Sequence, residues 1–140
     1  MTPTPDMGTL TVSDVMHRGV VTCSPSAELG EVAEAMAEHG IHCVVAIDEG
    51  PPGEDDDRIW GVVSDLDLVR GLRSKLDLDA GNLADLEITT VAPEDTLASA
   101  ADAMLQRRVG HLVVVADGRP VGVLSTLDIA RAVRRMPTRA

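Results

Sequence analysis

Apolar positions along the chain follow two alternating patterns, and the same series of patterns occurs twice. Short β-branched runs stand at 20–24 (VVTCS) and 89–92 (TTVA), and each is followed by apolar residues at helical spacing. In the first copy these helical positions are Leu29, Val32, Ala33 and Met36; in the second they are Leu97, Ala101 and Met104. We expect the N-caps of these two helices at Ser26 and Asp95, within about one residue.

Two strands and a second helix complete each copy. The nearly continuous apolar runs HCVVAI (42–47) and HLVVVA (111–116) are typical of buried strands. RIWGVV (58–63) and RPVGVL (119–124) predict the next strand, reached in the second copy through a turn at Asp117-Gly118. A helix then begins at Ser64 or Ser125. The apolar residues expected to face inward from it are Leu66, Val69 and Leu72 in the first copy, and Leu127, Ala130 and Val133 in the second.

These copies form an internal repeat of β-α-β-β-α units. Pro25 and Pro93 are 68 positions apart, whereas Ser64 and Ser125 are 61 apart, so the first copy holds a seven-residue insertion within the acidic stretch 48–58. The predicted organisation is a flexible N-terminus (1–10), repeat 1 (11–73), a connector (74–81) and repeat 2 (82–136). One repeat buries little surface alone, so we predict that the two pack as one α/β (α+β) domain with pseudo-twofold symmetry.

Composition narrows the classes of function. The chain has 140 residues, is 44% apolar and carries a net charge of −11. That charge argues against nucleic acid, whose affinity comes from neutralised phosphates. Neither a membrane span nor a secretory signal is evident, so a cytoplasmic location is expected. Cys23 and Cys43 are expected to be small buried hydrophobes.

The phrase Gly-x-x-Ser-x-x-Asp appears at Gly61–Asp67 and again at Gly122–Asp128. One interpretation is a capping box, in which serine and acid satisfy the free amides of a helix start. The other is a nucleoside-phosphate site. A helix N-terminus after a strand favours an anion, a carboxylate accepts hydrogen bonds from ribose hydroxyls, and glycine lets a ligand approach the backbone. The two interpretations can coexist.

The duplicated unit, the repeated Gly-x-x-Ser-x-x-Asp phrase and the methionine late in each first helix resemble a tandem pair of CBS domains, the family named after cystathionine β-synthase. The resemblance spans about Val12 to Val133. It implies a stand-alone regulatory module rather than an enzyme. Members often bind AMP, ADP or ATP between the repeats, sometimes S-adenosylmethionine or NAD, and usually form homodimers.

The resemblance also implies nucleotide-binding residues. Asp67 and Asp128 would hold ribose hydroxyls, Ser64 and Ser125 would lie beside ribose or phosphate, and Thr22 and Thr90 would lie near the base. The pairs His42–Cys43 and Gly110–His111 match positions where the family often places basic residues facing phosphate.

The sequence departs from the family at these positions: Val45 and Val113 replace a frequent proline, Cys43 stands where an arginine would help, and Gly110 has no side chain. With the negative charge, AMP suits the sites better than a triphosphate, and His111 is the best remaining phosphate contact.

Other candidate sites are weaker. His39, His42 and Cys43 have no matching ligand group, so no metal is expected; Asp55, Asp56 and Asp57 indicate a solvated loop. No catalytic constellation or catalytic cofactor is indicated. The alanine-rich first helices predict a homodimer through helices of both repeats, with a further protein partner that the sequence does not name. The alternative to a nucleotide sensor is an interaction scaffold in which Ser-x-x-Asp serves only as a helix cap.

Overall fold

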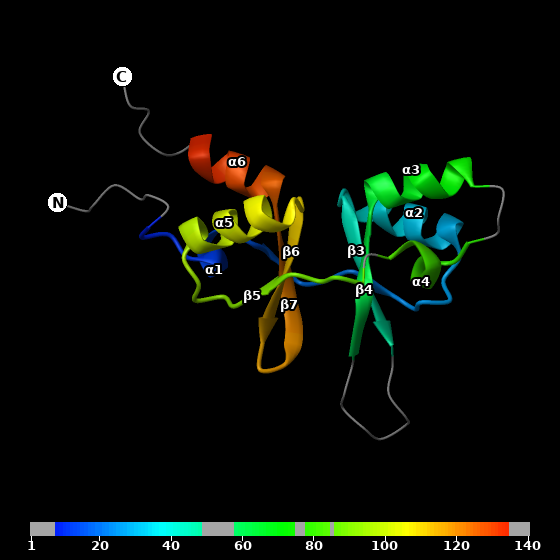
Figure 1. Cartoon of the computed structure of the whole chain (residues 1–140), viewed down its shortest axis with the longest axis horizontal. Helices are drawn as coiled ribbons and strands as arrows, with labels where there is room; N and C mark the ends of the chain where they lie inside the picture. Colours follow the sequence, from blue (N-terminus) through cyan, green and yellow to red (C-terminus); the bar gives the residue numbers. More distant parts are fainter. Residues whose placement is uncertain (1–7, 49–57, 75–77, 85, 135–140) are drawn as a thin grey trace. The chain divides into compact units, whose positions relative to one another are not determined.

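The computed structural model describes residues 8–48, 58–74, 78–84 and 86–134. Residues 1–7 of the predicted N-terminus, most of the acidic insertion (49–57) and part of the connector (75–77) lie outside the described residues. The chain divides into two compact units (Figure 1). We call Val20–Ile88 the middle unit, and Met1–Gly19 together with Thr89–Ala140 the terminal unit. The mixed α+β class that the sequence predicts is confirmed.

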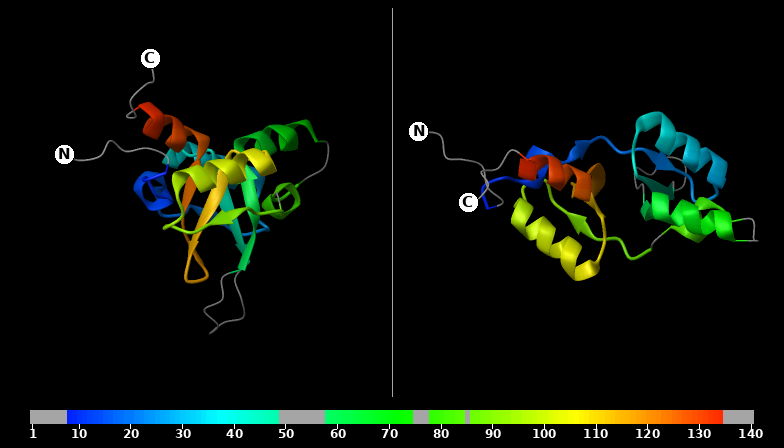
Figure 2. Two further views of the ribbon diagram at one scale, coloured as in Figure 1. Left: turned by 60° about the vertical axis from the view of Figure 1, so that its left-hand side comes forward. Right: turned by 90° about the horizontal axis from the view of Figure 1, so that it is seen from above.

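The middle unit contains a three-stranded sheet in the order β2-β3-β4. Its elements are β2 (Thr22–Cys23), α2 (Leu29–His39), β3 (Cys43–Asp48), β4 (Arg58–Ser64), α3 (Asp65–Arg73) and α4 (Ala80–Leu83). β2 pairs parallel with β3, which pairs antiparallel with β4. The helices lie on one face of this sheet, with α2 beside α3 (Figure 2).

The terminal unit repeats this plan with one strand more, in the order β1-β7-β6-β5. Its elements are α1 (Val12–Val15), β1 (His17–Arg18), β5 (Thr90–Val91), α5 (Leu97–Arg107), β6 (His111–Ala116), β7 (Arg119–Ser125) and α6 (Thr126–Arg134). The predicted turn between β6 and β7 is present: Asp117 and Gly118 both have positive φ, 52° and 75°. That pair of values is typical of the type I′ turn that closes two-residue hairpins.

The compact units do not coincide with the sequence repeats, because the repeats exchange their leading helices. Thr11 and Asp79, 68 positions apart, cap α1 and α4 respectively. The amide of Val12 donates to the carbonyl of Asp95 (2.8 Å), and that of Ala80 to the carbonyl of Ala27 (2.9 Å). Each short helix is therefore hydrogen-bonded to the segment that precedes the long helix of the other repeat.

The buried strand runs that the sequence predicts are present. Cys43–Ala46 and Leu112–Val114 are all buried. In the middle unit Val44 and Val63 join Val32 and Met36 in a core beneath the helices. In the terminal unit Leu112 and Leu124 join Leu97, Met104 and, from the N-terminal segment, Val12. The core is aliphatic in both units, since neither contains a buried aromatic side chain among the described residues.

The predicted inward faces of the final helices are wrong. Leu66, Val69 and Leu72 have exposed fractions of 55%, 53% and 82%. Leu127, Val133 and Ala130 are exposed as well. The buried positions of α3 are instead Asp67 and Gly71, and Ile129 and Ala132 of α6 pack on the core.

The physical reason is that the cap fixes the rotation of the helix. Asp67 must face Ser64 to close the capping box, and this turns the stripe of Leu66, Val69 and Leu72 away from the sheet. Gly71 then permits close packing, because a Cβ there would come within 2.9 Å of Leu29 of α2 and of Leu83 of α4.

The expected N-caps of the first long helices are partly corrected. The cap of α5 is Thr96, one residue from Asp95, and its hydroxyl accepts from the amide of Ser99 at 3.1 Å. The cap of α2 is Glu28, not Ser26. Ser26 instead forms a local turn with Ser24, whose hydroxyl lies 2.9 Å from that of Ser26.

Candidate functional site

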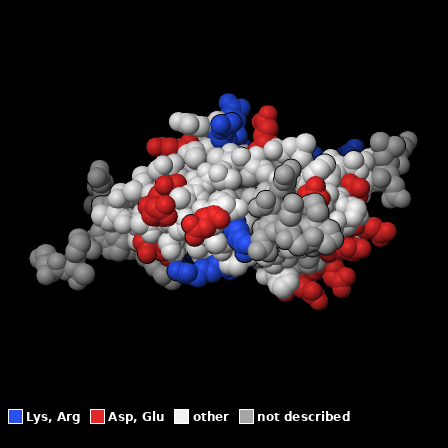
Figure 3. Space-filling model, turned by 90° about the horizontal axis from the view of Figure 1, so that it is seen from below, with Lys and Arg blue, Asp and Glu red and all other residues white. Residues whose placement is uncertain are grey.

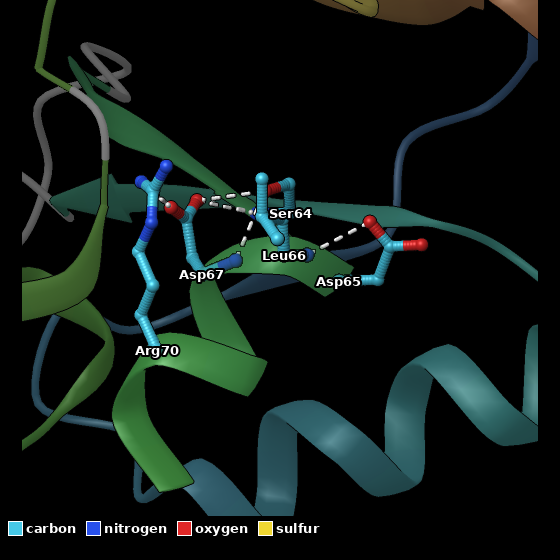
Figure 4. A network of polar contacts seen from close by, with 5 residues as sticks. All are labelled: Ser64, Asp65, Leu66, Asp67 and Arg70. Atoms are coloured by element: carbon cyan, nitrogen blue, oxygen red, sulfur yellow. Dashed lines mark hydrogen bonds and ion pairs between the residues drawn. The ribbon is translucent and has the colours of Figure 1, made fainter. Parts of the chain in front are cut away.

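The repeated phrase lies at a strand-to-helix junction in each unit. β4 ends at Ser64, which is the N-cap of α3. The Oδ2 atom of Asp67 accepts from the Ser64 amide at 2.8 Å and from the Ser64 hydroxyl at 2.9 Å, and the Asp67 amide donates to Ser64 Oγ at 3.2 Å (Figure 4). This is the reciprocal capping box that the sequence predicts.

The terminal unit repeats these contacts almost atom for atom. Asp128 Oδ2 accepts from the Ser125 amide at 2.9 Å and from the Ser125 hydroxyl at 3.0 Å, while the Asp128 amide donates to Ser125 Oγ at 3.2 Å. Both aspartates are buried, with exposed fractions of 9% for Asp67 and 6% for Asp128. The capping interpretation is therefore confirmed in both units, and in each case it uses only one carboxylate oxygen.

The other carboxylate oxygen of each aspartate faces a basic side chain. Arg70, one helical turn later on α3, places Nη1 at 3.4 Å from Asp67 Oδ1 (Figure 4). His17 of β1 places Nδ1 at 3.5 Å from Asp128 Oδ1. Each Oδ1 atom thus lies outside the capping box, and each has one basic side chain as its neighbour.

The predicted residues on the strands share one face of each sheet. In the middle unit Cys43 lies opposite Ser64 and Thr22 lies opposite Val45. Because side chains alternate along a strand, Thr22, Cys43 and Ser64 project from the same face. Val44 and Val63 project from the other face, into the core beneath the helices. The candidate residues are therefore on the face that the helices leave uncovered.

The terminal unit shows the same arrangement. His111 lies opposite Ser125, and Thr90 lies opposite Val113, so the three polar residues again share a face. Leu112 and Leu124 project to the helix side. In each unit the predicted threonine, the first residue of the following strand and the capping serine therefore share one face of the sheet.

The residues before β3 and β6 differ between the units. His42 is exposed, and its Nδ1 lies 3.0 Å from Asp65 Oδ2. In the terminal unit the equivalent position is Gly110, and a Cβ there would lie 3.8 Å from the methyl group of Thr126. The backbone link is the same in both: the Asp65 amide donates to His42 O (2.9 Å) and the Thr126 amide to Gly110 O (3.0 Å).

Gly122, the glycine of the second Gly-x-x-Ser-x-x-Asp phrase, lies against β1 and not against space for a ligand. A Cβ on Gly122 would collide with the backbone carbonyl oxygen of His17 and lie 3.1 Å from the sulfur of Met16. Gly122 is thus required for the close approach of β1, which pairs with β7 at this point. The expectation that this glycine admits a ligand to the backbone is corrected: the N-terminal strand occupies that space.

Neither cysteine takes part in a metal cluster within the part of the chain that the structure describes, where no group of three His, Cys, Asp or Glu side chains could hold an ion. Cys43 is buried in β3, as expected, whereas Cys23 is only partly buried, which corrects the expectation for it. Burial, with a smaller effect from Glu31, raises the pKa of the Cys23 thiol. A raised pKa disfavours the thiolate, the form that binds metals and reacts as a nucleophile.

Charge over the described surface is mixed. On the face shown in Figure 3, the few basic side chains form no continuous patch among the acidic ones. No helix among the described residues has the length and apolar character needed to cross a bilayer.

The duplicated junctions point to one family, and comparison with known proteins agrees. A family model described as CBS domain matches residues 12–74 and 80–135. The chain belongs to the CBS domain family. Its two matches in tandem confirm the CBS pair that the sequence resembles.

Known CBS proteins similar to this chain include bacterial and archaeal members. Hypoxic response protein 1 of Mycobacterium tuberculosis is 32% identical over an alignment of 125 residues that covers 86% of this chain and 83% of the relative. A solved structure of Hypoxic Response Protein I with two coordinated zinc ions has a TM-score of 0.69 at 30% identity, covering 86% of this chain and 97% of the other. A CBS domain protein from Pyrobaculum aerophilum complexed with AMP has a TM-score of 0.74 at 32% identity, covering 89% and 95% respectively.

Sequence reasoning missed His17. The offset of 68 shows that residues 11–19 belong to the repeat, but nothing in the spacing shows that they join the sheet of the other copy. The ion pair between Arg70 and Asp67 joins residues three positions apart on one helix, and it too emerges only from the structure.

Proposed function

We propose that this CBS pair is a regulatory module that binds an adenine nucleotide, with AMP as the first candidate, and signals by a change of conformation or association. The observation that supports it most is the spare oxygen on each buried aspartate: Asp67 Oδ1 and Asp128 Oδ1 take no part in the capping boxes. The AMP complex of the Pyrobaculum aerophilum relative adds support from a protein of the same family.

The proposed binding mode follows from the polar face of each sheet. The ribose hydroxyls would donate to Oδ1 of the aspartate, an acceptor whose hydrogen bonds are strengthened by its charge. Thr22 and Thr90 would contact the base, and Ser64 and Ser125 would lie beside the ribose or phosphate. His42 and His111 would face the phosphate, with Cys43 and Gly110 completing the two sets. A monophosphate suits a chain of net charge −11 better than a triphosphate does.

Thermal shift and calorimetric titration with AMP, ADP, ATP, NAD and S-adenosylmethionine test this proposal. A ligand at about 100 times its Kd stabilises the folded state by about 2.7 kcal/mol. Adenosine and 2′-deoxyadenosine form a matched pair, because only the first offers both ribose hydroxyls. Weaker binding of the deoxy compound is expected if the carboxylates hold the diol.

Asparagine variants separate the cap from the ligand site. Asp67→Asn and Asp128→Asn keep an oxygen that can accept from the serine amide, but replace the spare acceptor with a donor. We expect each variant to melt close to the parent chain and to lose binding at its own site. If no adenine compound shifts the melting of the parent chain, the chain is a scaffold whose aspartates serve only as caps.

We also propose a homodimer, now through the final helices as well as the alanine-rich first ones. Leu66, Val69 and Leu72 form an exposed stripe on α3, and Leu127 and Val133 form its counterpart on α6. Arg70 and Arg73 border the first stripe, whereas α2 exposes Glu34 and Glu38. A second copy of the chain supplies the complementary charge together with an apolar surface.

Analytical ultracentrifugation tests the dimer. A dimer at micromolar concentration is expected for the parent chain, and Leu72→Glu or Val133→Glu should shift it toward monomer. Arg18→Gln, an exposed change on β1 outside the helices proposed for the dimer, serves as the control and should leave the dimer intact. A parent chain that sediments as a monomer at this concentration would contradict the proposal.

A further inference from the structure

The two buried aspartates differ in the basic side chain that faces them. Asp67 Oδ1 faces Arg70, whose guanidinium keeps its charge at every physiological pH. Asp128 Oδ1 faces the imidazole of His17, 3.5 Å away. Histidine gains and loses its proton between about pH 5 and 8. The equivalent carboxylates therefore differ: Asp67 lies beside a side chain that is always charged, and Asp128 lies beside one whose charge depends on pH.

The position of His17 is fixed by its backbone rather than by its side chain. His17 pairs with Val123 across β1 and β7, and its carbonyl packs against Gly122. The imidazole itself is 58% exposed, whereas the carboxylate of Asp128 is 7% exposed. The ring is thus free to rotate away from Asp128 without disturbing the strand that holds it.

No other charged group takes the place of His17. The charged side chains on neighbouring elements are Asp14 of α1, Arg119 of β7, and Arg131 and Arg134 of α6, with Arg18 next in β1. Among the described residues, His17 and Asp128 lie within ion-pair distance of each other and of no other charged side chain. Asp14 Oδ2 accepts from the amide and hydroxyl of Thr11.

We propose that His17 gates the site at Asp128, so that adenosine binds in the terminal unit more tightly at pH 8.0 than at pH 5.5. This inference rests on the proposed function, in which ribose hydroxyls donate to Oδ1. A protonated His17 holds Oδ1 in an ion pair, and an incoming ribose must displace it. Binding therefore releases a proton, and a reaction that releases a proton is favoured at higher pH.

The middle unit provides the matched control. Arginine is a permanent charge, so binding at Asp67 has no corresponding gate. The proposed sites also contain His42 and His111, but adenosine lacks the phosphate that they would face. The contribution of His17 is obtained by comparing chains with and without it in otherwise identical backgrounds.

The experiment is calorimetric titration with adenosine at pH 5.5 and pH 8.0. The Asp67→Asn chain retains only the site at Asp128, and we expect adenosine to bind it about two- to fivefold more tightly at pH 8.0, the range of a partly exposed ion pair. Adding His17→Gln should remove that difference while leaving the fold intact, since the residue is on an exposed edge. In the Asp128→Asn chain, which retains only the site at Asp67, His17→Gln should not alter the pH profile.

Each other outcome is decisive. If adenosine binds and His17→Gln leaves the pH dependence at Asp128 unchanged, the gate is overturned while the nucleotide function stands. Tighter binding at pH 5.5 also overturns it. If adenosine and AMP bind neither single-site chain at either pH, the gate and the proposed function fail together.

Discussion

The middle and terminal units use the same capping box but differ in the basic side chain beside its aspartate. The distances from Ser64 to Asp67 and from Ser125 to Asp128 agree within 0.1 Å for each of three hydrogen bonds. The basic partner of the aspartate is Arg70 in one unit and His17 in the other. The comparison shows that the capping box depends only on neighbouring residues and starts a helix in both units. The basic residue beside the aspartate comes from the surrounding structure, and it determines how the second carboxylate oxygen is paired.

The largest expected effect tests whether the N-terminal segment is an integral part of the terminal unit. Val12 is fully buried in that core, so Val12→Asp places an unpaired charge there and should cost about 3–5 kcal/mol. Urea unfolding measures the loss by circular dichroism, while fluorescence of Trp60, which donates to Gly81 O in the middle unit, follows the other unit. Exposed Arg18→Asp in the same segment should cost less than about 0.5 kcal/mol. Equal losses for the two variants would contradict the assignment of Val12 to the core.

The next prediction concerns the approach of β1 to Gly122. Gly122→Ala forces its Cβ against the carbonyl of His17, and overpacking of this kind costs about 1–3 kcal/mol. Gly30 of α2 has no atom within 4 Å of the corresponding position, so Gly30→Ala should instead stabilise by about 0.5–1 kcal/mol. Opposite signs in thermal melting support the close approach; a stabilising Gly122→Ala would contradict it.

The next prediction is that removing either capping serine lowers the free energy of unfolding by the same amount. Because the two boxes have the same geometry, Ser64→Ala and Ser125→Ala should each cost about 1 kcal/mol. Their free energies of unfolding are expected to fall by amounts that agree within a few tenths of a kcal/mol. A much larger loss for one variant would show that its serine has a further structural task.

The smallest effect lies at the ends of the two long first helices. α2 ends at Gly40 with φ 59°, and α5 ends at Arg108 with φ 55°. Only glycine adopts this left-handed conformation without steric cost. Arg108→Gly should therefore stabilise by up to about 1 kcal/mol, and Gly40→Ala should destabilise by a similar amount, as measured by chemical denaturation. A loss of stability in Arg108→Gly would mean that the arginine side chain makes a compensating contact.

Several features of the site could be predicted because they join residues close in sequence. A capping box links positions three apart, so the spacing of Ser64 and Asp67 was sufficient to predict its contacts. The Asp117-Gly118 turn is equally local. The exposed stripe of Leu66, Val69 and Leu72 was assigned to the wrong face, since apolar spacing alone does not show that a buried aspartate fixes the rotation of α3.

The sequence by itself determined the repeat, the order of strands and helices and the two capped junctions, because periodicity and short-range hydrogen bonds depend on neighbouring residues. Only the tertiary structure decided that α1 and β1 belong to the compact unit of the second repeat, with β1 in its sheet, while α4 belongs to the unit of the first repeat. The two repeats offer similar aliphatic surfaces, and no local pattern tells a short helix which of them it will cover. The placement of β1 in that sheet brings His17 beside Asp128. This contact is the difference between the two sites, because Asp67 lies beside Arg70.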